Sequence, residues 1–190
     1  VVYYMNGGDT TAAGVWPTLF GSIGALCTCF LVIPIVTHCA QKYGKKVTFL
    51  YTQTVSLVGY SLFLWGFSPE NPWMMFIPLP LFAFGIGGLF TIMMSMTADV
   101  IDVDELNTGL RREGIFGAIY WWMVKVGFAI AGALSGVIIA FVGFNPDLAT
   151  TEQESAVNGL HAFFCFFPLA GTLFAMYIMR NYSIDETRAN

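Results

Sequence analysis

Five long apolar runs constrain this chain more than any other feature of its sequence. Each run is long enough to cross a hydrocarbon layer ~30 Å thick, which takes about 20 residues of helix. The runs cover residues 15–37, 47–67, 73–96, 115–142 and 160–179. Charged residues make up 11% of the 190 residues, against about a quarter in soluble domains. The sequence therefore predicts an all-α fold, a polytopic membrane helical bundle.

The basic residues predict how the runs are oriented in the membrane. Seven of the eight lie after the first, third and fifth runs: Lys42, Lys45, Lys46, Arg111, Arg112, Arg180 and Arg188. The segments on the other side, residues 6–14, 68–71 and 143–159, contain none. By the positive-inside rule, the loops 38–46 and 98–114 and the C-terminus are expected in the cytoplasm.

The eighth basic residue, Lys125, lies inside the fourth run, with no other charge from Ile115 to Val142. At ~1.5 Å per residue it is ~15 Å from Ile115, near the middle of the layer. An ammonium at that depth costs roughly 2.5–3.5 kcal/mol on insertion scales, so it is expected to face protein or water. A charge of this kind indicates a transport or relay pathway.

Aromatic residues surround Lys125 on the predicted helix. Trp121 and Trp122 precede it by four and three residues and share its face. Tyr120 and Phe128 flank them. Aromatic rings bind sugars by stacking on their C–H faces while polar groups bind the hydroxyls, so this face is a candidate sugar platform. Packing in the core of a bundle explains the same residues equally well.

A dense cluster of charges lies between the third and fourth runs. It consists of Asp99, Asp102, Asp104, Glu105, Arg111, Arg112 and Glu113. Carboxylates and guanidiniums at a helix–helix junction can form charge-assisted, partly bidentate pairs. At a junction that opens and closes, such pairs hold one state and are broken in the other. A solvated loop, in which each pair contributes ~0–1 kcal/mol, is an equally good interpretation.

An enzyme has to be considered as well. Asp99 and Asp102 resemble the aspartate pairs with which membrane prenyltransferases hold magnesium diphosphates. Those enzymes need a second acidic motif, and no other segment expected on the inner side contains one. The magnesium-dependent enzyme is therefore a minor alternative, and we expect no metal site.

The run ADVIDVDELNTGLRREGIFGAIYWWMVKVG resembles the signature of the glycoside–pentoside–hexuronide:cation symporters, relatives of the melibiose permease in the major facilitator superfamily. Six residues fall on the pattern without a gap: Asp99, Asp102, Glu105, Arg111, Glu113 and Lys125. The turn KYGKK matches the equivalent loop one hairpin earlier. The resemblance covers essentially the whole chain, from the end of the family's seventh helix through its twelfth. It implies that residues 1–190 form the C-terminal half of such a transporter.

The resemblance implies a secondary transporter, not an enzyme, that takes up a sugar or glycoside with Na⁺ or H⁺ by alternating access. Lys125 would lie by the sugar and cation sites and help couple them. A cytoplasmic gate would be formed by Asp99, Asp102, Glu105, Arg111, Arg112 and Glu113. Tyr120 and Trp121 stand where the melibiose permease has a polar pair near its sugar, and Phe90 stands where it has a tryptophan. The identity of the sugar therefore stays open.

The resemblance also implies partners and a location. The family's cation-binding aspartates and most sugar ligands lie in six N-terminal helices that this sequence lacks, and the opening VVYYM is typical of the last turn of an earlier helix. We therefore expect a fragment whose partners are those helices, membrane lipid and the sugar, with no nucleic acid and no cofactor besides the coupling ion. The bacterial cytoplasmic membrane is the expected location. A half-size membrane module that does not transport is the third alternative.

Overall fold

The computed structural model describes residues 2–68, 70–145, 148 and 152–181. The described residues are mostly helical and contain no strand. In chain order the helices are α1 (Val2–Asn6), α2 (Thr10–Ala13), α3 (Trp16–Cys27), η1 (Thr28–Val32), α4 (Ile33–Tyr43), α5 (Lys45–Gly66), η2 (Pro72–Phe76), α6 (Leu79–Thr108), α7 (Glu113–Val142) and α8 (Glu154–Arg180). Within the described ranges, five helical segments are long and apolar enough to cross a membrane. The predicted all-α polytopic bundle is confirmed.

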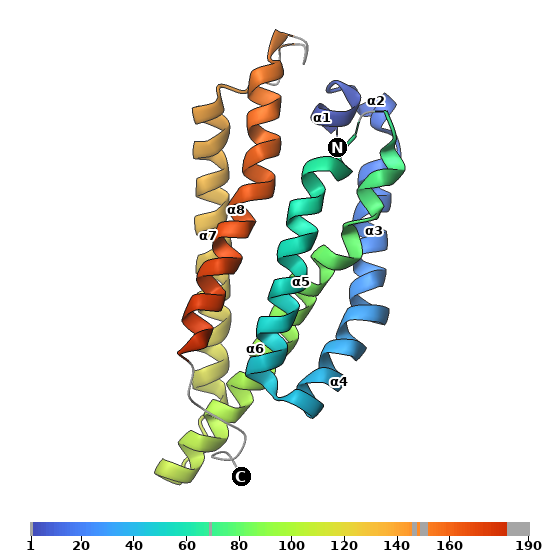
Figure 1. The fold of residues 1–190 in the computed structure, drawn as a ribbon. Coiled ribbons are helices and arrows are strands. Elements are labelled where there is room, and N and C mark those ends of the chain that lie inside the picture. Colours follow the sequence, from blue (N-terminus) through green and yellow to red (C-terminus); the bar gives the residue numbers. More distant parts are fainter. Residues whose placement is uncertain (1, 69, 146–147, 149–151, 182–190) are drawn as a thin grey trace.

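The connections that carry the basic residues lie together at one end of the bundle (Figure 1). We call this the basic end; its described basic residues are Lys42, Lys45, Lys46, Arg111, Arg112 and Arg180. The Lys46 ammonium donates a hydrogen bond to the Arg180 carbonyl oxygen at 2.9 Å, which ties the start of α5 to the end of α8. Arg188 lies outside the described residues. The assignment of this end to the cytoplasm stays a prediction.

The helices extend further than the predicted spans. The connection around KYGKK is a glycine-centred turn, as its sequence indicates, whereas most of the predicted loop 98–114 is helical. α4 ends at Tyr43 and α5 begins at Lys45, so the segment 38–46 is reduced to a turn at Gly44, where φ is +83°. α6 continues to Thr108, so residues 98–108 are helical. An apolar run marks only the part of a helix inside the hydrocarbon layer, and backbone hydrogen bonding carries the helix onward into the polar interface.

Proline residues interrupt two of the spans. The first span runs through α3, η1 and α4, and η1 is a π-helical turn in which the Ile33 N–H bonds to the Thr28 carbonyl. η1 ends two residues before Pro34, which has no N–H to donate and therefore disturbs the regular ladder of helix hydrogen bonds. The third span starts as the 3₁₀ turn η2, and α6 begins only after Pro78. Both interruptions lie inside runs that the sequence predicted as single spans, 15–37 and 73–96.

α5 and α6 pack along a seam of glycines and small polar side chains. A Cβ atom at Gly85 or Gly88 of α6 would lie 2.7 Å from Ser56 or Thr52 of α5, respectively. Gln53, which is 3% exposed, donates a hydrogen bond from Nε2 to the Gly85 carbonyl oxygen at 3.1 Å. Small residues let membrane helices approach closely, and buried polar side chains link them. This seam makes α5 and α6 the most extensively paired helices of the bundle.

Apolar side chains form two clusters around this pair of helices. Toward the basic end, the buried members are Val32, Val36, Phe49, Ala83, Ile92, Met96 and Met179. The second cluster contains Met5, Phe63, Phe67, Met75 and Cys165. α7 contributes no buried residue to either cluster, and it lies beside α8 at the edge of the bundle (Figure 1).

The seam makes a direct prediction about stability. A Cβ atom at Gly59 of α5 would lie 2.7 Å from the backbone nitrogen of Phe82 in α6, an atom that cannot move without shifting the helix. We expect Gly59→Ala to lower the free energy of unfolding by about 1–3 kcal/mol, as overpacking does in other cores. Denaturant-induced unfolding of the complete protein in detergent measures this change.

Gly21→Ala in α3 is the matched control, because no atom packs within 4 Å of the position that an added Cβ would occupy there. Helix propensity alone favours alanine over glycine by about 1 kcal/mol, so the control should be neutral or stabilising. Equal effects of the two substitutions would contradict the close approach of α5 and α6.

Candidate functional site

The junction between α6 and α7 is a tight turn that starts at a glycine. Gly109 has φ +68°, a left-handed conformation that favours glycine. Its N–H donates to the Glu105 carbonyl oxygen at 2.7 Å and closes the last turn of α6. The Thr108 hydroxyl accepts the Leu110 N–H at 3.3 Å. This local hydrogen bonding directs the two arginines that follow back onto the end of α6.

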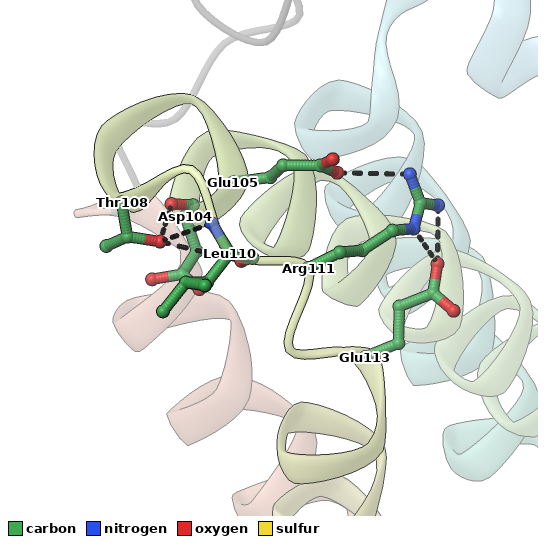
Figure 2. A network of polar contacts seen from close by, with 6 residues as sticks. All are labelled: Asp104, Glu105, Thr108, Leu110, Arg111 and Glu113. Atoms are coloured by element: carbon green, nitrogen blue, oxygen red, sulfur yellow. Dashed lines mark hydrogen bonds and ion pairs between the residues drawn. The ribbon is translucent and has the colours of Figure 1, made fainter.

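Arg111 links the end of α6 to the start of α7, as Figure 2 shows. Its Nη1 lies 3.0 Å from Glu105 Oε2, and its Nε donates to Glu113 Oε1 at 2.5 Å. Hydrogen bonding to Glu113, followed by the charges of Glu113 and Glu105, raises the pKa of Arg111 above its usual value. The side chains of Arg111 and Glu113 are 57% and 56% exposed, and exposed pairs contribute only ~0–1 kcal/mol each. The link can therefore be broken at low cost.

Arg112 forms the bidentate pair of the junction. Its Nε donates to Asp104 Oδ2 at 2.8 Å, and its Nη2 donates to Asp104 Oδ1. The fork geometry matches a carboxylate, and the hydrogen bonds to Asp104 raise the pKa of Arg112. The sequence placed Asp104 in the charge cluster but not among the gate residues. The helical path of α6 through this segment, which was expected to be a loop, is what brings Asp104 to Arg112.

A second link, between α5 and α6, was missed by the sequence analysis. Lys45 Nζ lies 2.6 Å from Asp99 Oδ1, and the two side chains are 20% and 17% exposed. Lys45 Nζ also lies 3.4 Å from the Ser95 carbonyl oxygen. The basic turn KYGKK was the available signal, but it indicated only the orientation of the helices and the family resemblance, not a partner for Lys45.

Asp102 is the member of the predicted gate with the weakest contacts. It is exposed, and its charge contributes to the raised pKa of Arg111, although among the described residues it forms no ion pair within 4 Å. The described residues contain no group of three or more metal-ligating side chains. Asp99, one half of the proposed magnesium pair, is instead held by the Lys45 ammonium.

The candidate cavity residues of α7 lie on an uncovered helix. Trp121, Trp122 and Phe128 are 49%, 63% and 64% exposed. The Tyr120 ring packs edge-on against Trp121, with centroids 5.4 Å apart. Core packing within the described part of this chain therefore does not explain these aromatic residues. Phe90, the fifth candidate, is half-buried on α6.

Lys125 is exposed on the same helix. Within the described ranges, no hydrogen bond or ion pair involves its ammonium group. The structure thus brings the charged residues of the basic end together, whereas it does not bring a partner to Lys125. The expectation that this lysine faces protein or water stays a prediction.

A family model matches nearly the whole chain. Residues 1–186 match the family model described as "MFS/sugar transport protein". No solved structure matches the chain significantly.

Three similar curated proteins are named as an importer, a carrier homolog and a transporter. The putative sulfoquinovose importer of Escherichia coli K12 is 28% identical over 171 residues, which cover 89% of this chain and 35% of that protein. The glucuronide carrier protein homolog of the same organism is 26% identical, with coverage of 82% and 33%. The isoprimeverose transporter of Lactiplantibacillus pentosus is 27% identical, with coverage of 86% and 34%. The chain spans about a third of the length of these relatives, and their names point to a transporter rather than an enzyme.

The partly buried pair Lys45–Asp99 and the exposed pair Arg111–Glu105 should differ in coupling energy. Because Lys45 and Asp99 are less than a quarter exposed, we expect a double-mutant cycle with Lys45→Ala and Asp99→Ala to give a coupling energy of about 1–2 kcal/mol. The cycle with Arg111→Ala and Glu105→Ala, whose side chains are 57% and 40% exposed, should give ~0–1 kcal/mol. Denaturant-induced unfolding of the complete protein measures both cycles, and a stronger Arg111–Glu105 coupling would contradict this ranking.

Proposed function

The chain belongs to the MFS/sugar transport protein family, and on this basis we propose that the complete protein takes up a sugar or glycoside together with Na⁺ or H⁺. The proposal rests first on Lys125, a single ammonium in the middle of an apolar helix. A charge at that depth is retained where it serves a substrate or ion pathway. The transport names of the similar proteins support the sugar as substrate class.

We propose that the ion pairs of the basic end act as the cytoplasmic gate. They join successive helices: Lys45–Asp99 links α5 to α6, and the two arginines link α6 to α7. When transporter halves rock around a site near the midplane, helices within one half can also shift, and ion pairs between neighbouring helices at one end would then form in one state and separate in the other. Conformational states that interconvert differ in free energy by only a few kcal/mol. Several exposed ion pairs of ~0–1 kcal/mol each can be broken within such a difference.

Lys125 is the proposed coupling residue. Its ammonium competes with, or is displaced by, the coupling ion, because two cations at one site repel each other. The aromatic residues beside it would supply rings on which a sugar stacks, with Trp121 and Trp122 on the same helical face as the lysine. The acidic partners of Lys125 and the main cation ligands would come from helices outside this sequence.

The chain would form the C-terminal half of a major facilitator transporter, with α1 as the end of the seventh helix and the five spans as helices eight to twelve. The protein would lie in a bacterial cytoplasmic membrane, with the basic end in the cytoplasm.

The coupling role predicts the effect of removing the charge. In the complete protein, Lys125→Ala should abolish accumulation of the sugar against its gradient while the protein is still expressed and inserted. The physical reason is that no internal cation is left for the coupling ion to displace. Uptake of radiolabelled sugar into energised vesicles measures the accumulation ratio.

Met123→Ala is the matched control, because Met123 is an exposed, uncharged residue of the same helix. It should keep the wild-type accumulation ratio. If Lys125→Ala also accumulates sugar like wild type, the lysine does not couple transport.

The gate predicts a different kinetic signature. Arg111→Ala removes the bridge from Glu105 to Glu113 and should slow turnover several-fold, with little effect on sugar affinity. Turnover from initial uptake rates and affinity from equilibrium binding separate the two. A large loss of affinity with intact turnover would instead make Arg111 a direct ligand of the sugar.

A further inference from the structure

A groove between α4 and α5 lies at the basic end and takes no part in the proposed gate. Its volume is about 440 Å³, and its lining residues are Cys39, Tyr43, Val47, Thr48 and Tyr51. This volume is within the range of sites that bind small molecules. We propose that the groove binds one anionic phospholipid of the surrounding bilayer, with the phosphate at Lys42 and an acyl chain along the apolar lining.

The rim of the groove combines aromatic and apolar side chains that face outward. Tyr43, Val47 and Tyr51 are 58%, 57% and 64% exposed. Thr48 forms the floor, and its hydroxyl already donates to the Gly44 carbonyl oxygen at 2.9 Å. Tyrosine is enriched where membrane meets water, because its ring is apolar and its hydroxyl is polar. The groove therefore offers hydroxyl groups at its rim and an apolar interior.

Lys42 provides the positive charge. Its side chain is exposed, with Nζ 5.3 Å from the centroid of the Tyr43 ring, a cation–π contact that holds it at the rim. In the described part of the chain, no hydrogen bond or ion pair uses the Lys42 ammonium, so its three N–H donors are available. Lys45, by contrast, is already paired with Asp99.

The apolar surface continues from the groove toward the middle of the membrane. Ile35 lies four residues before Cys39 on α4, so the two share a helical face. Val58 lies seven residues after Tyr51 on α5 and likewise shares its face. Ile35 and Val58 are 41% and 52% exposed. An acyl chain that leaves the groove therefore finds apolar side chains along its path.

The charge and the lining of the groove favour an anionic phospholipid over a second copy of the chain or a sugar. Basic pockets between membrane helices on the cytoplasmic side bind anionic lipid head groups. A second copy of the chain docked through the same groove would bring two Lys42 ammonium groups close together, which is unfavourable. A sugar requires several converging polar groups, whereas the lining has only two tyrosine hydroxyls available at its rim.

The test is lipid binding to the complete, detergent-purified protein, measured by native mass spectrometry with phosphatidylglycerol or phosphatidylcholine. Wild type should bind the first phosphatidylglycerol about fivefold more tightly than phosphatidylcholine, the order expected for one basic residue at an anionic surface. Lys42→Gln should remove this preference, and Lys42→Arg should keep it. Val47→Trp, which fills the groove, should weaken the binding of both lipids.

Tyr177→Ala on α8 is the matched control, since Tyr177 is 68% exposed and lies outside the groove; it should bind both lipids like wild type. Unchanged binding in both Lys42→Gln and Val47→Trp would overturn the proposal. Equal competition by soluble glycerol phosphate would overturn the lipid in favour of a soluble anion. Disulfide cross-linking of two copies through Val47→Cys would overturn it in favour of a dimer. Each readout is independent of sugar transport, so the two proposals fail separately.

Discussion

At Gly59 and Phe82 the backbones of α5 and α6 come so close that one added methyl group would lie 2.7 Å from a peptide nitrogen. The rest of the structure depends on this contact. The packing of α5 on α6 along this seam sets the register of the two helices, which places Lys45, at the first turn of α5, 2.6 Å from Asp99. The charged junction to α7 begins at the end of α6. The pairs Lys45–Asp99 and Arg111–Glu105 therefore connect α5, α6 and α7 at the basic end.

The charges at that end fall into two groups with different physical properties. Lys45–Asp99 is largely covered and joins helices that the glycine seam already holds together. The side chains of the Arg111 pairs are 40–57% exposed and join α6 to α7, a helix with no buried residue. A movement of α7 would therefore break the weaker pairs first. On this basis we propose the α6–α7 junction, where the Arg111 pairs and the Arg112–Asp104 pair lie, as the movable part of the gate.

The sequence predicted the five spans well, because membrane insertion depends on apolar length and that is visible in one dimension. It could not predict where helices end in the polar interface, so residues 98–108 were expected to be a loop and Asp104 was not assigned to Arg112. Lys45 and Asp99 are far apart in sequence, and only packing of α5 on α6 reveals their pairing. The partners of Lys125 could not be predicted, since none lies in the described part of the chain.

The proposed coupled uptake of a sugar can be measured with the complete protein in proteoliposomes. A panel of labelled sugars and glycosides would be offered while Na⁺ and H⁺ gradients are imposed separately. The expected result is accumulation of at least one sugar above equilibrium under one of the two gradients, and loss of that accumulation when an ionophore collapses the gradient. Simple equilibration of every sugar under both gradients would contradict the claim.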